Sequence, residues 1–119
     1  MVKINVLIDN QPGDDALLEC EHGLSFYIET GCSRVLCDMG ASEKFISNAS
    51  RMGIDLSAID FAFVSHGHAD HTGGLPDYLK VFGEKKVYLS ERISKEMYFS
   101  SRRGSRRDIS TERSVFENH

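Results

Sequence analysis

Residues 65–74 read SHGHADHTGG, and this stretch lies near the middle of the chain. It contains three of the five histidines of the chain together with an aspartate. The apolar run FAFV at 61–64 comes directly before it, which predicts a buried strand that delivers the loop to one edge of a sheet. A solvated histidine-rich loop would need neither this spacing nor this strand, so the stretch predicts a metal-binding loop.

The candidate metal ligands are His66, His68, Asp70 and His71. In an extended loop, His66 and His68 project to the same side because side chains alternate with a period of two, so their imidazoles can share one cation. Asp70 and His71 follow where a helix is expected to begin, which would aim them at a second position beside the first. Imidazole and carboxylate ligands suit zinc, iron or manganese, and ligand type alone leaves the choice among these metals open.

The segments before the loop predict a β-hairpin and a helix. An alternating run favours a strand at 2–8, and two further β-rich runs favour a hairpin formed by 24–30 and 34–38. Apolar residues at helical spacing favour an amphipathic helix over 42–52, with Ser42 as its N-cap.

The segments after the loop predict a second helix and a further strand. Apolar residues at helical spacing favour a helix that includes 75–82, and a strand is expected at 86–90, parallel to 61–64. The complete order is β-hairpin, helix, strand, metal loop, helix, strand. This order is typical of an α/β fold built in layers.

The pattern His66-x-His68-x-Asp70-His71 with a following glycine pair resembles the metal-binding signature (HxHxDH) of the metallo-β-lactamase fold superfamily. Four further segments are similar to one branch of it, the metal-dependent hydrolases that resemble dihydropterin ribofuranosyl-aminobenzene phosphate synthases. These segments are VLIDN at 6–10, EHGLSF at 21–26, LCDMG at 36–40 and GIDL at 53–56.

The resemblance implies the N-terminal half of an αββα metallo-β-lactamase sandwich. In this family a further histidine, a bridging aspartate and another histidine come from later loops. His119 is the only histidine after the motif, and its surroundings match none of those loops. We therefore expect the remaining ligands of a two-metal zinc site to come from elsewhere, with iron or manganese as alternative metals.

The resemblance also implies a role for each motif residue. His66 and His68 would hold one metal, and Asp70 and His71 the other, with Asp70 also acting as the catalytic residue that steers the nucleophile. Asp38 would accept a hydrogen bond that orients a ligand imidazole. An aspartate that caps a turn is the alternative for Asp38.

Three residues outside the motif are candidates for the rim of a substrate site. The resemblance implies this place for His22, Asp9 and Asn10. For His22, a surface histidine without a role in binding is the alternative that the sequence leaves open.

Two functions follow from these expectations. In the first, the chain is a metal-dependent hydrolase that uses a metal-activated water on a small, phosphorylated molecule. In the second, it is a truncated and catalytically silent domain that binds metal or associates with itself. Half of a two-sheet sandwich exposes the apolar face of its sheet, which predicts self-association that completes the fold.

Composition limits the partners and the compartment. The 119 residues form one domain or part of one, and the net charge of −4 argues against a general nucleic-acid or anionic-membrane binder. There is no apolar run of spanning length and no signal peptide pattern, so we expect a cytoplasmic protein. Cys20, Cys32 and Cys37 have no metal or disulfide spacing and are expected to be reduced.

Residues 101–119 differ in charge from residues 1–100. Residues 101–119 carry five arginines against three acidic residues, whereas residues 1–100 have a net negative charge. We expect a partial metallo-β-lactamase-like domain at 1–100 and an arginine-rich tail at 101–119 that is disordered or exchanged between chains. Its two Arg-Arg pairs are also able to bind a phosphate.

Overall fold

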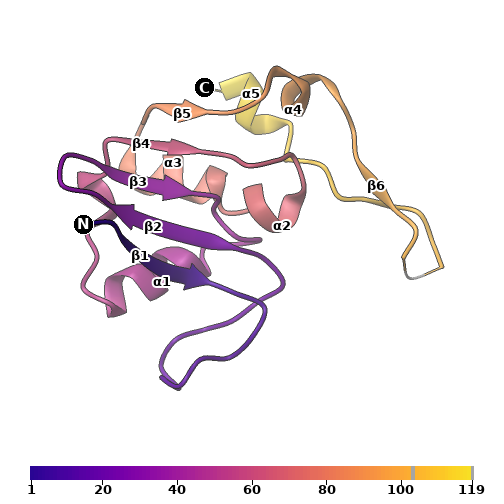
Figure 1. The fold of residues 1–119 in the computed structure, drawn as a ribbon. Helices are drawn as coiled ribbons and strands as arrows, with labels where there is room; N and C mark the ends of the chain where they lie inside the picture. The colour runs from indigo at the N-terminus through magenta and orange to yellow at the C-terminus, as the bar shows by residue number, and fades with distance from the viewer. Residues whose placement is uncertain (103, 119) are drawn as a thin grey trace.

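The computed structural model describes residues 1–102 and 104–118, so Arg103 and His119 lie outside the described residues. Five strands form one sheet in the order β1-β2-β3-β4-β5, as Figure 1 shows. The strands are β1 (Lys3–Ile8), β2 (Ser25–Glu29), β3 (Arg34–Cys37), β4 (Phe61–Phe63) and β5 (Val87–Tyr88).

The pairing within the sheet agrees with the predicted order. β1 pairs antiparallel with β2, and β2 pairs antiparallel with β3. The β2–β3 turn is closed by the Thr30 hydroxyl, which accepts hydrogen bonds from the amides of Cys32 (3.2 Å) and Ser33 (2.9 Å). β4 lies parallel to β3, and β5 parallel to β4, so the expected hairpin and parallel strand are both confirmed.

Two helices cover one face of the sheet, α1 (Lys44–Arg51) and α3 (Leu75–Phe82), and Figure 1 shows both behind the strands. A short 3-10 helix, η1 (Leu56–Ala58), leads into β4. The core between sheet and helices contains Leu36, Phe45, Ala62 and Tyr78, none of which has solvent-accessible surface. Burial of these side chains is what fixes the helices to this face.

Helix α1 begins later than the sequence predicts. The expected N-cap was Ser42, but the helix starts at Lys44 and Glu43 occupies the N-cap position without a side-chain bond. The reason is that the Ser42 hydroxyl donates to the Glu21 carboxylate at 2.7 Å. Glu21 also accepts the amides of Ala41 and Ser42, so a residue distant in sequence organises this turn.

The opposite face of the sheet is apolar across all five strands. Ile4, Val6 and Tyr88 on this face are 60%, 46% and 53% exposed. Strand register and the alternation of side chains place the following residues on it, and we call them the apolar sheet face: Ile4, Val6, Phe26, Ile28, Val35, Cys37, Phe61, Phe63 and Tyr88.

The chain after β5 folds back onto the loop that follows β4. It forms α4 (Glu91–Lys95), a two-stranded hairpin of β6 (Phe99–Ser100) and β7 (Arg107–Asp108), and α5 (Ser114–Asn118). Ser110 forms a β-bridge with His68, and Thr111 is only 4% exposed.

The described part of 101–119 thus packs against the rest of the chain, and the expectation of a tail that is disordered or exchanged between chains stays a prediction. Val115 is buried in the same core cluster as the helices that cover the sheet. The division of the chain at residue 100 stays a prediction. Among the helices of the described residues, none has the length and apolar character needed to cross a membrane.

Candidate metal centre

The candidate metal centre lies at the edge of the sheet where β3 and β4 end. Because these strands are parallel, Asp38 after β3 and the loop 65–71 after β4 meet at the same edge. The loop enters α2 (Ala69–Thr72), whose N-cap is His68. The His68 carbonyl accepts the amides of His71 (3.0 Å) and Thr72 (3.2 Å), which fixes the backbone between the candidate ligands.

The glycine pair after α2 allows the loop to approach the turn that follows β3. A Cβ at Gly73 would lie 2.2 Å from the Ala41 carbonyl oxygen, and one at Gly74 would lie 2.2 Å from the Met39 carbonyl oxygen. No side chain fits at those distances. The Met39 amide also donates to the His71 carbonyl at 2.7 Å, so the two segments are held in direct backbone contact.

Asp38 lies beneath the loop with 1% of its surface exposed and a left-handed backbone (φ 58°) that aspartate tolerates better than most residues. Its Oδ1 accepts the Ser65 amide at 2.7 Å, and its Oδ2 accepts the Ser65 hydroxyl at 2.5 Å. Oδ2 also lies 2.8 Å from His71 Nδ1. Because a carboxylate accepts, His71 donates from Nδ1, and its Nε2 keeps a lone pair for a metal.

Ser65 extends the same arrangement to His66. The Ser65 hydroxyl hydrogen is directed to Asp38, so its oxygen accepts from His66 Nδ1 at 2.9 Å and leaves Nε2 of His66 as the ligand atom. Burial lowers the pKa of His66, and the neighbouring His71 and His68 lower it further. A lowered pKa favours the neutral imidazole, which is the form that binds metals.

All four predicted ligands converge at this edge. Two groups have ligand atoms that lie within 4.8 Å of one another: one consists of Asp38, His66 and His71, and the other of His66, His68 and Asp70. The His66 ring centroid lies 4.7 Å from that of His68 and 4.2 Å from that of His71. The oxygens of Asp38 already accept three hydrogen bonds, which favours an orienting role over direct ligation for this residue.

Of the predicted rim residues, the structure brings only His22 to the ligands. His22 Nε2 lies 3.2 Å from Asp70 Oδ2, and the His22 side chain is 71% exposed. Asp70 Oδ2 also lies 3.6 Å from His71 Nε2, so this carboxylate stands between two imidazoles. Asp9 and Asn10 are exposed at the same edge, after β1, and within the described residues they contact none of the candidate ligands.

Two residues near the ligands were missed by the sequence interpretation. The Tyr98 ring lies edge-on to His68, with 5.4 Å between ring centroids. The Thr111 hydroxyl donates to the Gly67 carbonyl (3.1 Å) and contacts the Thr72 hydroxyl (2.9 Å). Both residues follow the motif by some thirty to forty positions in segments without a strong periodic pattern, so no local signal connects them to the loop.

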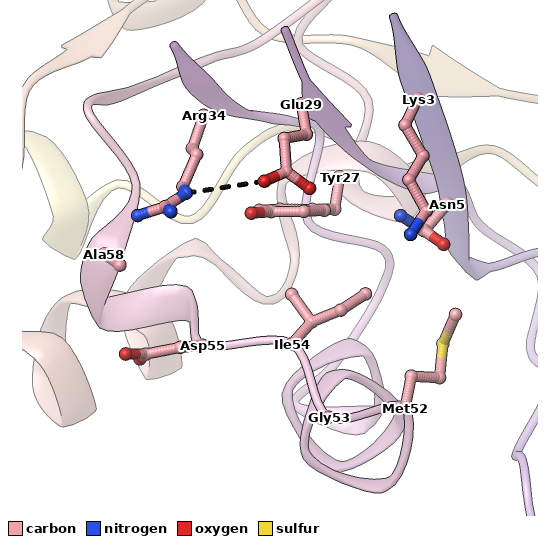
Figure 2. Close-up of a pocket in the computed structure, with 10 residues that line it drawn as sticks. All are labelled: Lys3, Asn5, Tyr27, Glu29, Arg34, Met52, Gly53, Ile54, Asp55 and Ala58. Carbon is pink, nitrogen blue, oxygen red and sulfur yellow. Dashed lines mark ion pairs between the residues drawn. The ribbon is translucent and has the colours of Figure 1, made fainter. Parts of the chain in front are cut away.

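A surface hollow lies elsewhere, at the opposite end of the sheet. It has a volume of about 390 Å³ and lies on the side of the sheet that α1 covers. Figure 2 shows the Tyr27 ring in its centre, with the ion pair between Arg34 Nε and Glu29 Oε1 (3.7 Å) at one side. Lys3 and Asp55 also line it, and it contains none of the predicted site residues.

The arrangement of strands and ligands has a match among known families. The family model described as the metallo-β-lactamase superfamily matches residues 18–117. The chain belongs to the metallo-β-lactamase superfamily. The matched range runs past residue 100, so it includes most of the segment expected to be a tail.

The curated relatives of this superfamily member include the branch that the sequence indicated. The chain is 34% identical over 84 residues to the 7,8-dihydropterin-6-methyl-4-(β-D-ribofuranosyl)-aminobenzene-5′-phosphate synthase of Methanocaldococcus jannaschii, which covers 66% of this chain and 29% of the relative. It is 36% identical over 76 residues to the lactamase-like protein ptaB of Pestalotiopsis fici, covering 60% of this chain and 22% of that protein.

Solved structures of superfamily members confirm the α/β fold. Tm1679, described as a metal-dependent hydrolase of the β-lactamase superfamily, superposes with a TM-score of 0.74 at 30% sequence identity. The match covers 98% of this chain and 40% of the Tm1679 chain. A B3 metallo-β-lactamase with an active-site glutamic acid matches 72% of this chain and 34% of its own, with a TM-score of 0.54 at 25% identity. The chain thus spans less than half the length of these relatives.

Proposed function

We propose that this chain acts as a metal-dependent hydrolase on a small, phosphorylated molecule. The observation that carries the proposal is the convergence of His66, His68, Asp70 and His71, two of whose imidazoles are oriented through Asp38 so that Nε2 is left as the ligand atom. An orientation network of this kind is typical of functional metal sites, because it fixes the tautomer of each ligand before the metal binds.

The donor set fits a divalent metal ion such as zinc, with iron or manganese as alternatives, since it consists of neutral imidazole nitrogens and a carboxylate. When bound, such an ion supplies an activated water and polarises the scissile group. His66 and His68 are proposed to hold one ion, and Asp70 and His71 the other. Asp70 is also proposed to accept a proton from the nucleophile, and the proximity of His22, whose Nε2 lies 3.2 Å from Asp70 Oδ2, supports this role.

Two observations support a phosphorylated substrate. The curated relative from M. jannaschii is named for a product that carries a 5′-phosphate. In this chain, the hairpin β6–β7 is anchored on the metal loop and carries exposed arginines at 102, 106 and 107. Guanidinium groups bind phosphate oxygens in bidentate geometry, so exposed arginines on a hairpin that is joined to the loop favour an anionic ligand.

The second candidate function is a catalytically silent domain that binds metal or associates with itself. It is favoured by the exposed apolar sheet face and by the ligand count. Four side chains are few for two ions, since a zinc site uses three or four protein ligands. The hydrolase proposal therefore includes ligands from another chain or from sequence beyond these residues.

Metal content per chain tests the proposal first. We expect about one to two tightly held ions per chain in a size-resolved preparation made without chelator, measured by plasma mass spectrometry. His68→Ala should lower that content and abolish hydrolysis in a screen of chromogenic phosphate esters while the fold persists by circular dichroism. Protein that carries no metal would leave a catalytically silent, self-associating domain as the better account. Hydrolysis that survives in His68→Ala would contradict the role proposed for His68 in the metal centre.

A further inference from the structure

The three histidines of the loop differ in how their rings are held. The His71 ring donates to Asp38, and the His66 ring donates to Ser65. For the His68 ring, the part of the chain that the structure describes offers no hydrogen bond. The contacts of the His68 ring are instead aromatic, with the His66 ring at 4.7 Å and the Tyr98 ring at 5.4 Å between centroids.

The Tyr98 contact has the geometry of an attractive aromatic pair. The planes of the Tyr98 and His68 rings meet at 70°, which is an edge arrangement, and the centroid separation lies within the favourable range for such pairs. An edge contact of this kind restricts the rotation of a ring without using either of its nitrogens. Both nitrogens of His68 therefore remain available.

Tyr98 is itself fixed to the metal loop through the backbone. Its amide donates to the Ser110 hydroxyl at 2.6 Å, and its carbonyl accepts the Ile109 amide at 2.8 Å. Ser110 forms the β-bridge with His68, and the Ile109 carbonyl accepts the Ala69 amide at 2.7 Å. Figure 1 shows the chain after α4 passing beside α2, where these bonds form.

Gly67 leaves the space that the Tyr98 ring needs. A Cβ at position 67 would lie 2.7 Å from Tyr98 Cε2 and 3.3 Å from Ile93 Cγ1. A contact of 2.7 Å is too short for a Cβ atom, so a side chain at this position would displace the tyrosine ring. The residue between the first two histidines is thus matched to an aromatic side chain thirty-one positions later.

We propose that Tyr98 is the positioning residue of His68. It orients the His68 ring, as Asp38 orients the His71 ring and Ser65 orients the His66 ring. The aromatic ring of Tyr98 performs this role, and its hydroxyl is dispensable because its contact with Glu96 Oε2 is long at 3.4 Å. The consequence for metal binding rests on the proposed function, whereas the positioning of the ring does not.

The positioning is tested on metal-free protein by nuclear magnetic resonance. Three-bond couplings from the His68 Cγ to its backbone nitrogen and carbonyl carbon report the populations of the χ1 rotamers. We expect one rotamer in the wild type and in Tyr98→Phe, and averaged couplings in Tyr98→Ala and in Gly67→Ala. Phe99→Ala is the matched control, because Phe99 is the neighbouring aromatic and stacks on Arg106 instead of a histidine.

Titration with Co²⁺, followed by its visible absorption, tests the consequence. Tyr98→Ala should raise the dissociation constant of the ion that His68 holds by about tenfold or more, and Tyr98→Phe and Phe99→Ala should leave it unchanged. If Tyr98→Ala does not fold, Tyr98→Leu replaces it, since leucine fills space without an aromatic edge.

The outcomes separate this inference from the proposed function. Averaged His68 couplings in the wild type, or a single rotamer that persists in the folded Tyr98→Ala or Tyr98→Leu protein, would overturn the positioning role. A wild type that binds no Co²⁺ would overturn the proposed function, and the coupling data would still decide the role of Tyr98.

Discussion

Asp38 is the residue on which two of the three motif imidazoles depend. We expect Asp38→Ala to weaken metal binding by at least about tenfold, since both His71 and, through Ser65, His66 lose their fixed tautomers. The Ser65 amide would also lose its charged acceptor, at a cost of about 1–3 kcal/mol in the free energy of unfolding. Metal titration and urea denaturation measure the two effects.

A control for this substitution exists at the opposite end of the sheet. Asp60 Oδ2 accepts the Arg34 amide at 2.7 Å, so Asp60→Ala also removes an acceptor from a backbone amide. It should leave metal affinity unchanged. Equal losses of metal affinity in Asp38→Ala and Asp60→Ala would mean that Asp38 acts only through stability.

Tyr78 is expected to make the free energy of unfolding fall at alkaline pH. Its side chain is fully buried, its hydroxyl lacks a hydrogen-bond partner among the described residues, and burial raises its pKa from 10.0 to about 12. A pKa raised on folding means that the stabilisation is complete below pH 10 and is lost as pH rises from 10 towards 12. Tyr78→Phe should lose less stability in that window than the wild type.

The same substitution should raise stability at neutral pH by about 1 kcal/mol, because it removes a buried hydroxyl without a partner. Urea denaturation of both proteins at pH 8 and pH 10.5 provides the comparison. Burial also raises the pKa of Cys37, to about 11. Because Cys37 is present in both proteins, its contribution to the pH dependence cancels when their stabilities are compared. A less stable Tyr78→Phe at pH 8 would show that the hydroxyl has a partner in solution.

Among the elements, α3 depends most on the glycine pair that precedes it. Gly73→Ala should lower the free energy of unfolding by about 3 kcal/mol, because a Cβ there meets the Ala41 backbone and the turn cannot yield without moving the helix. Gly31→Ala is the matched control, with no atom within 4 Å of its Cβ and an unstrained backbone. Thermal melts that shift equally for both variants would contradict this account.

Elements with a periodic pattern were predictable from the sequence, and those fixed by distant contacts were not. The hairpin, the parallel strand β5 and helix α3 follow from hydrophobic spacing, and the loop after β4 follows from its histidines. The start of α1 was missed because Glu21, not a neighbour, engages Ser42. The packing of 107–118 was missed because two-residue strands and single hydroxyl contacts such as that of Thr111 leave no periodic trace.

At the scale of the whole molecule, the unbalanced sheet is the main feature. One face is covered by α1 and α3, whereas the apolar sheet face includes three large side chains that are about half exposed. Patches of this kind in soluble proteins mark interaction sites. We expect the chain to associate through this face, with itself or with a polypeptide that completes the superfamily fold.

Charge introduced on the apolar sheet face tests this association. The double variant Ile4→Glu and Val6→Lys should shift the protein to the monomer in analytical ultracentrifugation while its circular dichroism stays unchanged. Val81 on α3 is 61% exposed on the other side of the molecule, so Val81→Lys should leave the oligomeric state unchanged. A wild type that is monomeric at high micromolar concentration would rule out self-association.

The backbone bond from Ala69 to Ile109 has a consequence for the order in which the chain folds. During synthesis, the histidine loop leaves the ribosome forty residues before the segment that supplies its backbone acceptor. The five-stranded sheet and the helices α1 and α3 are complete once residue 88 has emerged, but the ring of Tyr98 and the hydroxyl of Thr111 are not yet available at that point. The loop therefore reaches its final geometry only after residue 111 has been synthesised, and we expect full metal affinity no earlier than that.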